Sequence, residues 1–378
     1  MSNSALRVLI VPDKFKGTLD AAGVAAAIGR GWGAARPQDT VELLPMSDGG
    51  DGFGGILGHW QQAQSLTTPT LDAAHRPCPA AWWLNRQDGT AIIESAKVIG
   101  LAMLPPGRYH PFDLDSRGLG AVLMDASRQG ARHALIGIGG SATNDAGFGL
   151  ALTLGWQFLD ALQRPLSQWT DLPRLAHARP PTNPVPLPRL TVAVDVQNPL
   201  LGPHGCSRIY GPQKGLRPED MATAEAALTQ LAEILHQQTG QRLELVPGAG
   251  AAGGLGFGLM AFAGATLESG FAVFARTTGL ADKVRAASLV ITGEGALDPS
   301  SIMGKGVGEV ARLCQALGVP CLGLAGQVVE APGLAELFAR TRGLTQLTDP
   351  ATAIADPVRW LEQAARELGT SLNAKSGI

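Results

Sequence analysis

The stretch GIGGSATNDAGFGLALTLGW, Gly137 to Trp156, decides the fold of this chain because a glycine-rich turn joins the end of a strand to the start of a helix. The apolar run from His133 to Ile138 predicts a buried strand. Gly139 and Gly140 then let the backbone approach a ligand more closely than a residue with a Cβ atom would permit. A strand, a turn and a helix in this order are typical of α/β folds.

Four polar residues fill the predicted turn: Ser141, Thr143, Asn144 and Asp145. The first turn of a helix carries unpaired amides and the positive end of the helix dipole, which favour an anion such as phosphate or carboxylate. The same residue types also cap helices without binding any ligand. This loop therefore predicts either an anion site or an ordinary helix cap.

Further apolar runs predict more strands, and most are of the continuous kind that parallel sheets bury on both faces. They lie at residues 7–11, 41–45, 91–94, 190–194, 288–292 and 320–325. Helical periodicity separates several of them, at residues 21–32, 222–237 and 305–317. A chain of 378 residues is also too long for one ordinary core. The sequence therefore predicts an α/β protein of two domains.

Composition narrows the class of protein. A net charge of −2 and an isoelectric point near 6.4 argue against nucleic acid or an anionic membrane as the main partner, because both require a strong positive field. The four cysteines lack the spacing of a zinc site or a disulfide framework. The sequence contains no basic-then-apolar leader and no run of about 18 apolar residues. We expect a cytoplasmic protein with reduced thiols.

Two motifs at predicted strand ends carry candidate ligands for phosphate and metal. The motif PDKFKGTL contains Asp13, Lys14 and Lys16, which suit a phosphate or carboxylate together with a metal-bridged oxygen. The motif SDGGDG presents Asp48 and Asp51, which carry the oxygen ligands that Mg²⁺ prefers. The alternatives are a solvated loop for the first motif and a plain turn for the second.

Two later stretches place further carboxylates at predicted strand ends. In AVDVQNPLLGPHGCSRIYGPQKG, Asp195 ends a strand, and Arg208 and Lys214 follow nearby in sequence. A carboxylate beside cations can orient or deprotonate a hydroxyl while the cations neutralise charge on a phosphoryl group. In LVITGEGALD, Glu294 follows another buried strand.

The stretch PGAGAAGGLGFG contains a G-x-G-x-x-G pattern at Gly248, Gly250 and Gly253. A dinucleotide-binding fold requires a strand before this pattern and an acidic residue ending a second strand about 20 residues later. Glu268 has that separation but does not end an apolar strand. We interpret these glycines as close backbone packing or a phosphate loop. The signatures of P-loop enzymes and of protein kinases do not occur in the sequence.

Six motifs together resemble those of the bacterial glycerate kinase family. They are PDKFKGTL, SDGGDG, GIGGSATNDAGFG, DVQNPLLGPHGCSRIYGPQKG, PGAGAAGGLG and TGEGALD, in the order of the family and over nearly the whole chain. The resemblance implies ATP-dependent phosphorylation of D-glycerate with Mg²⁺, giving 2-phosphoglycerate, with 3-phosphoglycerate as the alternative product.

The resemblance also implies an architecture of two unlike α/β domains. One is flavodoxin-like with a mainly parallel sheet, the other is restriction-endonuclease-like, and the active site lies in the cleft between them. We place the first at residues 1–75 and 286–378 and the second, inserted domain at residues 76–285.

Roles for individual residues follow as expectations. We expect Asp195 to act as the base or orienting group and Lys16 to stabilise charge on the transferred phosphoryl group. Arg208 or Lys214, with amides of the Gly139–Asn144 turn, would hold the glycerate carboxylate. Three carboxylates would hold Mg²⁺: Asp48, Asp51 and Glu294. The candidates for binding substrate or phosphate are Asp13, Lys14, Gly139, Gly140, Ser141, Thr143, Asn144, Asp145, Asn198, Lys214, Gly250 and Gly253.

Other possibilities stay open at this point. A dinucleotide-dependent hydroxy-acid oxidoreductase would use the Gly248 loop, and a non-catalytic sensor would bind glycerate without turnover. The expected partners are D-glycerate and ATP, and a homodimer is one option for the oligomeric state.

Overall fold

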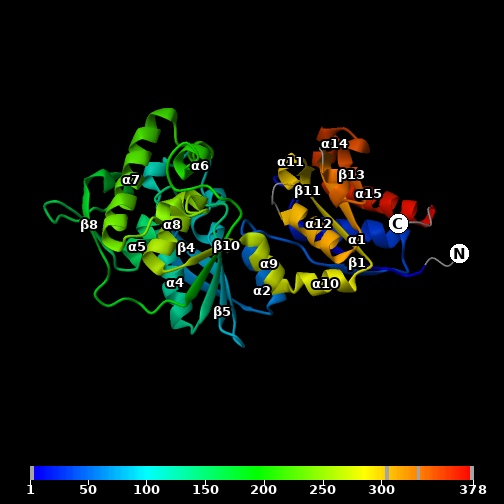
Figure 1. Ribbon diagram of the computed structural model, residues 1–378, viewed down its shortest axis with the longest axis horizontal. Helices are drawn as coiled ribbons and strands as arrows, with labels where there is room; N and C mark the ends of the chain where they lie inside the picture. The colour runs from blue at the N-terminus through cyan, green and yellow to red at the C-terminus, as the bar shows by residue number, and fades with distance from the viewer. Residues whose placement is uncertain (1–3, 303–305, 330–332, 375–378) are drawn as a thin grey trace. The chain divides into compact units, whose positions relative to one another are not determined.

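The structure is a computed structural model that describes residues 4–302, 306–329 and 333–374. The chain forms two compact units (Figure 1). The terminal unit comprises residues 1–47 and 274–378, and the central unit comprises residues 48–273. Within the described ranges, every helix is too short or too polar to span a bilayer.

The terminal unit is built on a five-stranded parallel sheet in the order β13-β12-β11-β1-β2. Its strands are β1 (Arg7–Pro12), β2 (Thr40–Leu43), β11 (Leu289–Leu297), β12 (Cys321–Val328) and β13 (Arg340–Gly343). The apolar runs explain this arrangement, because residues 8–12 and 289–293 are buried and belong to the middle of the sheet. Figure 1 shows the blue β1 in one sheet with the yellow-orange β11, although about 280 residues separate them in sequence.

Helices complete the terminal unit. Helix α1 (Ala21–Ala35) begins at Asp20, whose carboxylate accepts the Gly23 amide at 2.7 Å, and it packs against α15 (Pro357–Ala374). The other helices are α10 (Leu280–Ala286), α11 (Pro299–Ile302), α12 (Gly306–Leu317), α13 (Leu334–Leu337) and α14 (Pro350–Ala355), and α9 (Gly270–Thr278) crosses the boundary between the units in sequence.

The central unit contains a six-stranded mixed sheet in the order β10-β9-β6-β5-β4-β3. Its strands are β3 (Gln64–Leu71), β4 (Pro77–Asn85), β5 (Thr90–Glu94), β6 (His133–Gly137), β9 (Arg189–Val194) and β10 (Thr266–Ser269). Strands β5, β6, β9 and β10 run parallel, whereas β3 and β4 are antiparallel. The loops that follow β5, β6 and β9 therefore leave the same edge of the sheet.

Six helices of the central unit share one buried apolar core with this sheet. They are α3 (Ala96–Ile99), α4 (Arg117–Arg128), α5 (Phe148–Thr153), α6 (Cys206–Lys214), α7 (Met221–Thr239) and α8 (Ala251–Ala263). Helix α2 (Phe53–Trp60) buries Phe53 and Leu57 and packs against β4 and β5. A separate antiparallel hairpin, β7 (Gln157–Asp160) with β8 (Leu175–Arg179), lies outside the large sheet.

The predicted α/β class is confirmed, and each predicted apolar run overlaps a strand of one of the two large sheets. The sequence did not predict β3, β4, β7, β8, β10 and β13. These strands are short, or they are only partly buried and carry proline, threonine or charged residues. The continuous apolar pattern that marks central parallel strands is therefore missing from them.

The boundaries of the compact units differ from those expected from the sequence. The expected boundaries fell near residues 75 and 285, whereas the units change at residues 47 and 273. Strand β3 pairs along its whole length with β4, which places residues 64–71 in the central unit. Gly270 also packs on the backbone of Asp48, because a Cβ atom at Gly270 would lie 1.5 Å from the Asp48 carbonyl oxygen.

Candidate functional site

Two glycine-rich loops pack backbone to backbone beside the carboxyl end of β6 in the central unit. The Gly139 amide donates to the Gly49 carbonyl at 3.0 Å, and a Cβ atom at Gly139 would lie 2.7 Å from the Gly50 Cα atom. A Cβ atom at Gly49 would lie 2.8 Å from the carbonyl of Ala193 in β9. Glycine is required in both loops because their backbones touch, and the SDGGDG loop is thereby fixed beside β6 and β9.

The two aspartates of the SDGGDG loop differ in exposure. Asp48 is half-buried and Asp51 is exposed. The Asp51 carboxylate lies against Gly140, where an added Cβ atom would be 2.7 Å from Oδ1. Asp51 is therefore close to the exposed backbone of the Gly139–Gly140 turn.

Glu94 is a residue of this region that the sequence analysis did not select. It ends β5, is 1% exposed, and accepts the amides of Gly52 at 3.1 Å and Gly54 at 2.9 Å. A carboxylate that accepts amides at the start of α2 stabilises that helix and holds the preceding loop. The signal that could have identified Glu94 is its place at the end of a buried strand, which resembles the place of Asp195 directly after β9.

The four polar side chains of the loop after β6 point into the protein. Ser141 is 4% exposed, and Thr143, Asn144 and Asp145 are fully buried. Asn144 Nδ2 donates to Ser207 Oγ at 2.9 Å. Helix α5 begins only at Phe148. These side chains are therefore turned away from solvent and precede the first turn of α5, and their binding of an anion stays a prediction. The open part of the loop is the backbone of Gly139 and Gly140.

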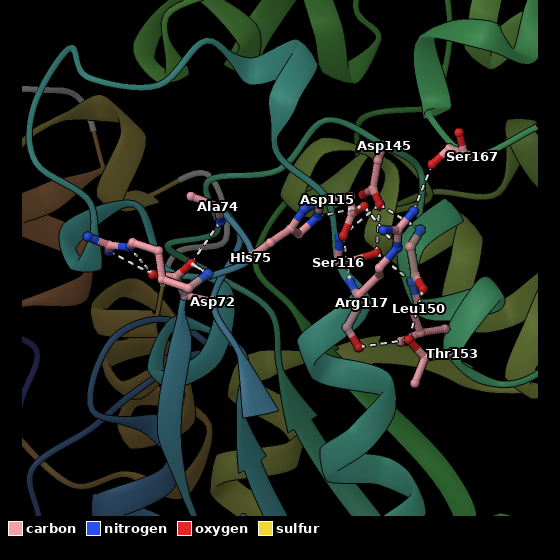
Figure 2. A network of polar contacts seen from close by, with 12 residues as sticks. Asp72, Ala74, His75, Asp115, Ser116, Arg117, Asp145, Leu150, Thr153 and Ser167 are labelled. Carbon is pink, nitrogen blue, oxygen red and sulfur yellow. Dashed lines mark hydrogen bonds and ion pairs between the residues drawn. The ribbon is translucent and has the colours of Figure 1, made fainter. Parts of the chain in front are cut away.

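Asp145 acts as a cap inside the central unit. Its carboxylate accepts the backbone and hydroxyl of Ser116 and the amides of Gly147 and Gly149. Burial, followed by the charge of Asp115, raises the pKa of Asp145, whereas these hydrogen bonds lower it. Figure 2 shows Asp145, Ser116 and Asp115 gathered beside α4. The observed contacts match the helix-cap alternative for this residue.

Lys214 ends α6 beneath the same loop. Its side chain is buried, and Nζ donates to Ser141 Oγ at 3.1 Å and to the Thr143 carbonyl at 2.6 Å. Burial lowers the pKa of Lys214 to about 8, although the charge of Asp145 opposes this effect. The structure therefore brings an ammonium group under the Gly139–Gly147 loop.

The glycines of PGAGAAGGLGFG serve close packing. Gly250 donates its amide to the Asn198 carbonyl at 2.9 Å, and a Cβ atom there would lie 2.2 Å from the Pro199 carbonyl. The 3-10 helix Leu243–Leu245, not a strand, precedes the pattern, so the local geometry differs from a dinucleotide-binding motif. Of the two interpretations given to these glycines, the contacts favour close packing.

Gly253 gives a direct test of this packing. It has φ +71°, and an added Cβ atom would lie 2.0 Å from the Thr143 carbonyl and 2.9 Å from Lys214 Nζ. We expect Gly253→Ala to lower the free energy of unfolding by about 3 kcal/mol or more, from left-handed strain and the forced shift of the Thr143 carbonyl. Gly264→Ala is the matched control, because Gly264 has φ +66° with open space around it and should lose only about 1 kcal/mol. Denaturant titration measures the free energy of unfolding of both variants, and an equal decrease in the two would contradict the packing role of Gly253.

Asn198, Asp195 and Arg208 lie after β9. The Asn198 side chain is used within the chain, since it donates to the His204 carbonyl at 2.8 Å and accepts the Tyr210 hydroxyl at 2.6 Å. Asp195 is exposed, and its charge adds to burial in raising the pKa of Tyr210. Arg208 is exposed in the first turn of α6. Asp195 and Arg208 are therefore accessible to a ligand, whereas the Asn198 side chain shapes the loop.

The terminal unit carries a second group of predicted residues, in the loop after β1 and in the neighbouring part of β11. Glu294 was expected to follow its strand, but β11 continues to Leu297, and Glu294 lies one residue beyond the pairing of Gly293 with Pro12, where β1 ends. The Asp13 amide donates to the Gly293 carbonyl at 2.8 Å, and the Lys14 amide donates to Asp13 Oδ1 at 2.7 Å. Lys16 is exposed, and Glu294 accepts the Ser301 hydroxyl at 2.6 Å. Strand β1 lies between β2 and β11, which makes this edge a topological switch point, the place where open α/β sheets bind ligands.

No metal cluster is preformed in the part of the chain that the structure describes. Groups of three or more histidine, cysteine, aspartate or glutamate side chains arranged to hold a metal ion do not occur among these residues. Asp48 and Asp51 belong to the central unit, and Glu294 belongs to the terminal unit. Mg²⁺ commonly binds to one or two carboxylates together with substrate phosphates, so the chemistry of Asp48 and Asp51 fits that ion.

Comparison with known proteins identifies the family. The profile of the glycerate kinase family matches residues 8–373. The chain belongs to this family. A glycerate kinase of Halalkalibacterium halodurans is 33% identical over 371 residues, which cover 96% of this chain and 97% of that protein. The glycerate 2-kinase of Escherichia coli K12 is 34% identical over 346 residues, which cover 87% of each chain.

A solved structure supports the same relationship. A Salmonella typhimurium LT2 structure described as a glycerate kinase 2 aligns with a TM-score of 0.83 at 30% identity, covering 98% of this chain and 99% of that one. The family resemblance predicted from the six motifs is thus confirmed. As a member of this family the protein is a kinase, which is a phosphotransferase, and the family implies the use of ATP.

Proposed function

We propose that this glycerate kinase transfers the γ-phosphoryl group of ATP to D-glycerate and releases 2-phosphoglycerate. The observation that carries the proposal is the family match over residues 8–373, together with the packing of the SDGGDG and Gly139–Gly147 loops beside β6 and β9. The name of the Escherichia coli relative, glycerate 2-kinase, favours the 2-hydroxyl as the acceptor. A homodimer and a cytoplasmic location stay predictions.

In the central unit, we assign the glycerate carboxylate to Arg208 and to the amides of Gly139 and Gly140. Arg208 is exposed and has a guanidinium group suited to a carboxylate, and the two glycines have exposed or half-exposed backbone. Lys214 would contribute a positive charge from beneath the loop, where burial strengthens electrostatic interactions. Asp195 would orient the acceptor hydroxyl or accept its proton.

The residues proposed for nucleotide and metal lie in both units. Asp48 and Asp51 would hold Mg²⁺, with Glu294 as a further candidate, and Lys16 would stabilise charge on the transferred group. When bound, the metal neutralises charge on the β- and γ-phosphates. The protein's own contribution is to position these groups and to supply fixed charges, since phosphoryl transfer depends mainly on positioning and electrostatics.

We also infer that the terminal unit is flavodoxin-like. Numbered along this unit alone, its strands lie in the order 2-1-3-4-5, which is the order of flavodoxin-like sheets. Lys16 follows the first of these strands, and Glu294 lies within the third, one residue beyond the point where it pairs with the end of the first. The restriction-endonuclease-like description of the central unit stays a prediction.

Phosphorus NMR of the purified protein with Mg-ATP and D-glycerate tests the function directly. We expect a new resonance of 2-phosphoglycerate. A resonance of 3-phosphoglycerate would keep the kinase but change the assigned acceptor hydroxyl. Absence of any phosphorylated glycerate, with glycerate still bound, would overturn the proposal in favour of a sensor.

The depressed pKa of Lys214 predicts how glycerate binding depends on pH. Lys214 is protonated below about pH 8 and loses its charge above it, so attraction for the glycerate carboxylate is present below that pH and is lost above it. We expect the KM for glycerate to rise from pH 7 to pH 9. The Lys214→Met variant should have a higher KM for glycerate at pH 7 than the wild type, and its KM should not rise further between pH 7 and pH 9. A wild-type rise that persists in the variant would exclude Lys214 as its cause.

A further inference from the structure

Asp145 is a fully buried carboxylate with four hydrogen-bond donors around it. Oδ2 accepts the Ser116 amide at 2.9 Å, the Ser116 hydroxyl at 2.7 Å and the Gly149 amide at 2.9 Å. Oδ1 accepts the Gly147 amide at 3.3 Å. All four groups are hydrogen-bond donors, and such surroundings favour the ionised form of a carboxylate. These contacts leave no place for a substrate beside Asp145.

These bonds join two helix starts to the end of one loop. Ser116 precedes the first residue of α4, and Gly149 lies in the first turn of α5. The Ser116 hydroxyl also accepts the Leu150 amide at 3.0 Å. Figure 2 shows Asp145, Ser116 and Leu150 together in this arrangement. The charge of Asp145 thus satisfies amides at two helix starts, where a negative charge is favoured.

The loop that Asp145 ends is held at further points. Its start is joined to the SDGGDG loop by the bond from Gly139 to Gly49, and its middle is joined to α6 by Asn144 with Ser207 and by Lys214 with Thr143. The charged or titratable groups acting on Lys214 are Asp145 from the loop and the Cys206 thiol from its own helix. Burial raises the pKa of Cys206 to about 12, so the thiol is uncharged near neutral pH. Burial and Asp115 raise the pKa of Asp145, but the four donors that its oxygens accept favour the ionised form.

We propose that Asp145 is a positioning residue, which fixes the Gly139–Gly147 loop against α4 and α5. The inference rests on the proposed function, in which this loop and Lys214 bind glycerate. In this role Asp145 acts through the loop and contacts neither glycerate nor phosphate.

The test is Asp145→Asn, which keeps the shape and one carbonyl oxygen but removes the charge. An asparagine oxygen in the place of Oδ2 can still accept from Ser116 and Gly149. We expect kcat/KM for glycerate to fall about 10- to 100-fold, mainly through KM, because the loop geometry and the charge state of Lys214 both change. Without the Asp145 charge the pKa of Lys214 falls further, so the loss of activity at alkaline pH should begin at a lower pH.

Asp160→Asn is the matched control. Asp160 is also a buried carboxylate of the central unit, and it caps a turn by accepting the Leu162 amide at 2.8 Å and the Arg164 amide at 2.9 Å. This variant should melt at a lower temperature. Its KM for glycerate and the pH at which activity falls on the alkaline side of the pH profile (the alkaline limb) should equal those of the wild type. If Asp145→Asn behaved in the same way, Asp145 would be structural only and the proposal would be overturned.

Ser116→Ala separates the effect of loop geometry from the effect of the Asp145 charge. It also provides the test if the Asp145→Asn protein does not fold. It removes one donor to Asp145 but leaves the charge, so the KM for glycerate should rise several-fold while the alkaline limb stays in place. An unchanged KM in a folded Ser116→Ala protein would contradict the positioning role. Wild-type protein assayed in parallel distinguishes these outcomes from failure of the proposed function, which would abolish glycerate phosphorylation in every sample.

Discussion

Replacing Asp195 by asparagine is expected to lower the turnover of D-glycerate about 100-fold or more while the KM for glycerate changes little. The exposed carboxylate that follows β9 would be lost as the group that orients or deprotonates the acceptor hydroxyl. An interaction made mainly in the transition state lowers kcat and kcat/KM together when it is removed. Steady-state kinetics with varied glycerate at saturating Mg-ATP measure both quantities.

Asp113→Asn provides the control for that substitution. Asp113 is an exposed aspartate of the same central unit, in a 3-10 helix, so its replacement makes the same chemical change at a site with no proposed role. Its turnover should equal that of the wild type. Wild-type turnover in the Asp195→Asn enzyme would remove Asp195 from the mechanism.

Asp51→Asn is expected to raise the Mg²⁺ concentration required for half-maximal activity about tenfold or more. Asp51 is exposed, so the loss of its charge should leave the fold intact, while one of the proposed metal carboxylates becomes a neutral amide. A titration of activity with Mg²⁺ at fixed ATP measures the effect, and Asp48→Asn should behave similarly. Manganese binding followed by electron paramagnetic resonance gives a readout independent of turnover. An unchanged Mg²⁺ requirement in both variants would exclude this pair as the metal site.

The sequence could predict where the candidate residues lie along the strands. Asp13, Asp195 and Glu294 each follow a continuous apolar run, and such runs become parallel strands whose carboxyl ends share one edge of their sheet. The same reasoning applied to Glu94 would have identified it, because it too ends a buried strand. These features depend on local pattern alone.

The direction of the side chains could not be predicted in the same way. Asn144 and Asp145 point inward because their partners, Ser207 and Ser116, come from α6 and from the start of α4, 63 and 29 residues away in sequence. The burial of Lys214 depends likewise on contacts with Ser141 and Thr143 across the fold. A local motif that contains serine, threonine, asparagine and aspartate fits a ligand site and a helix cap equally well. Only tertiary packing decides between them.

The pairing of β1 with β11 has a consequence for how the chain is made. Residues 1–47 are synthesised before the central unit, yet β1 lies inside its sheet and must wait for a neighbour that is synthesised about 280 residues later. Until then one edge of this apolar strand stays unpaired, a state that favours association with other chains. We expect the central unit, whose residues are contiguous, to fold first during synthesis and the terminal unit to fold last. A chain arrested before β11 should therefore need chaperones at its N-terminal segment, whereas its central unit should already resist proteolysis.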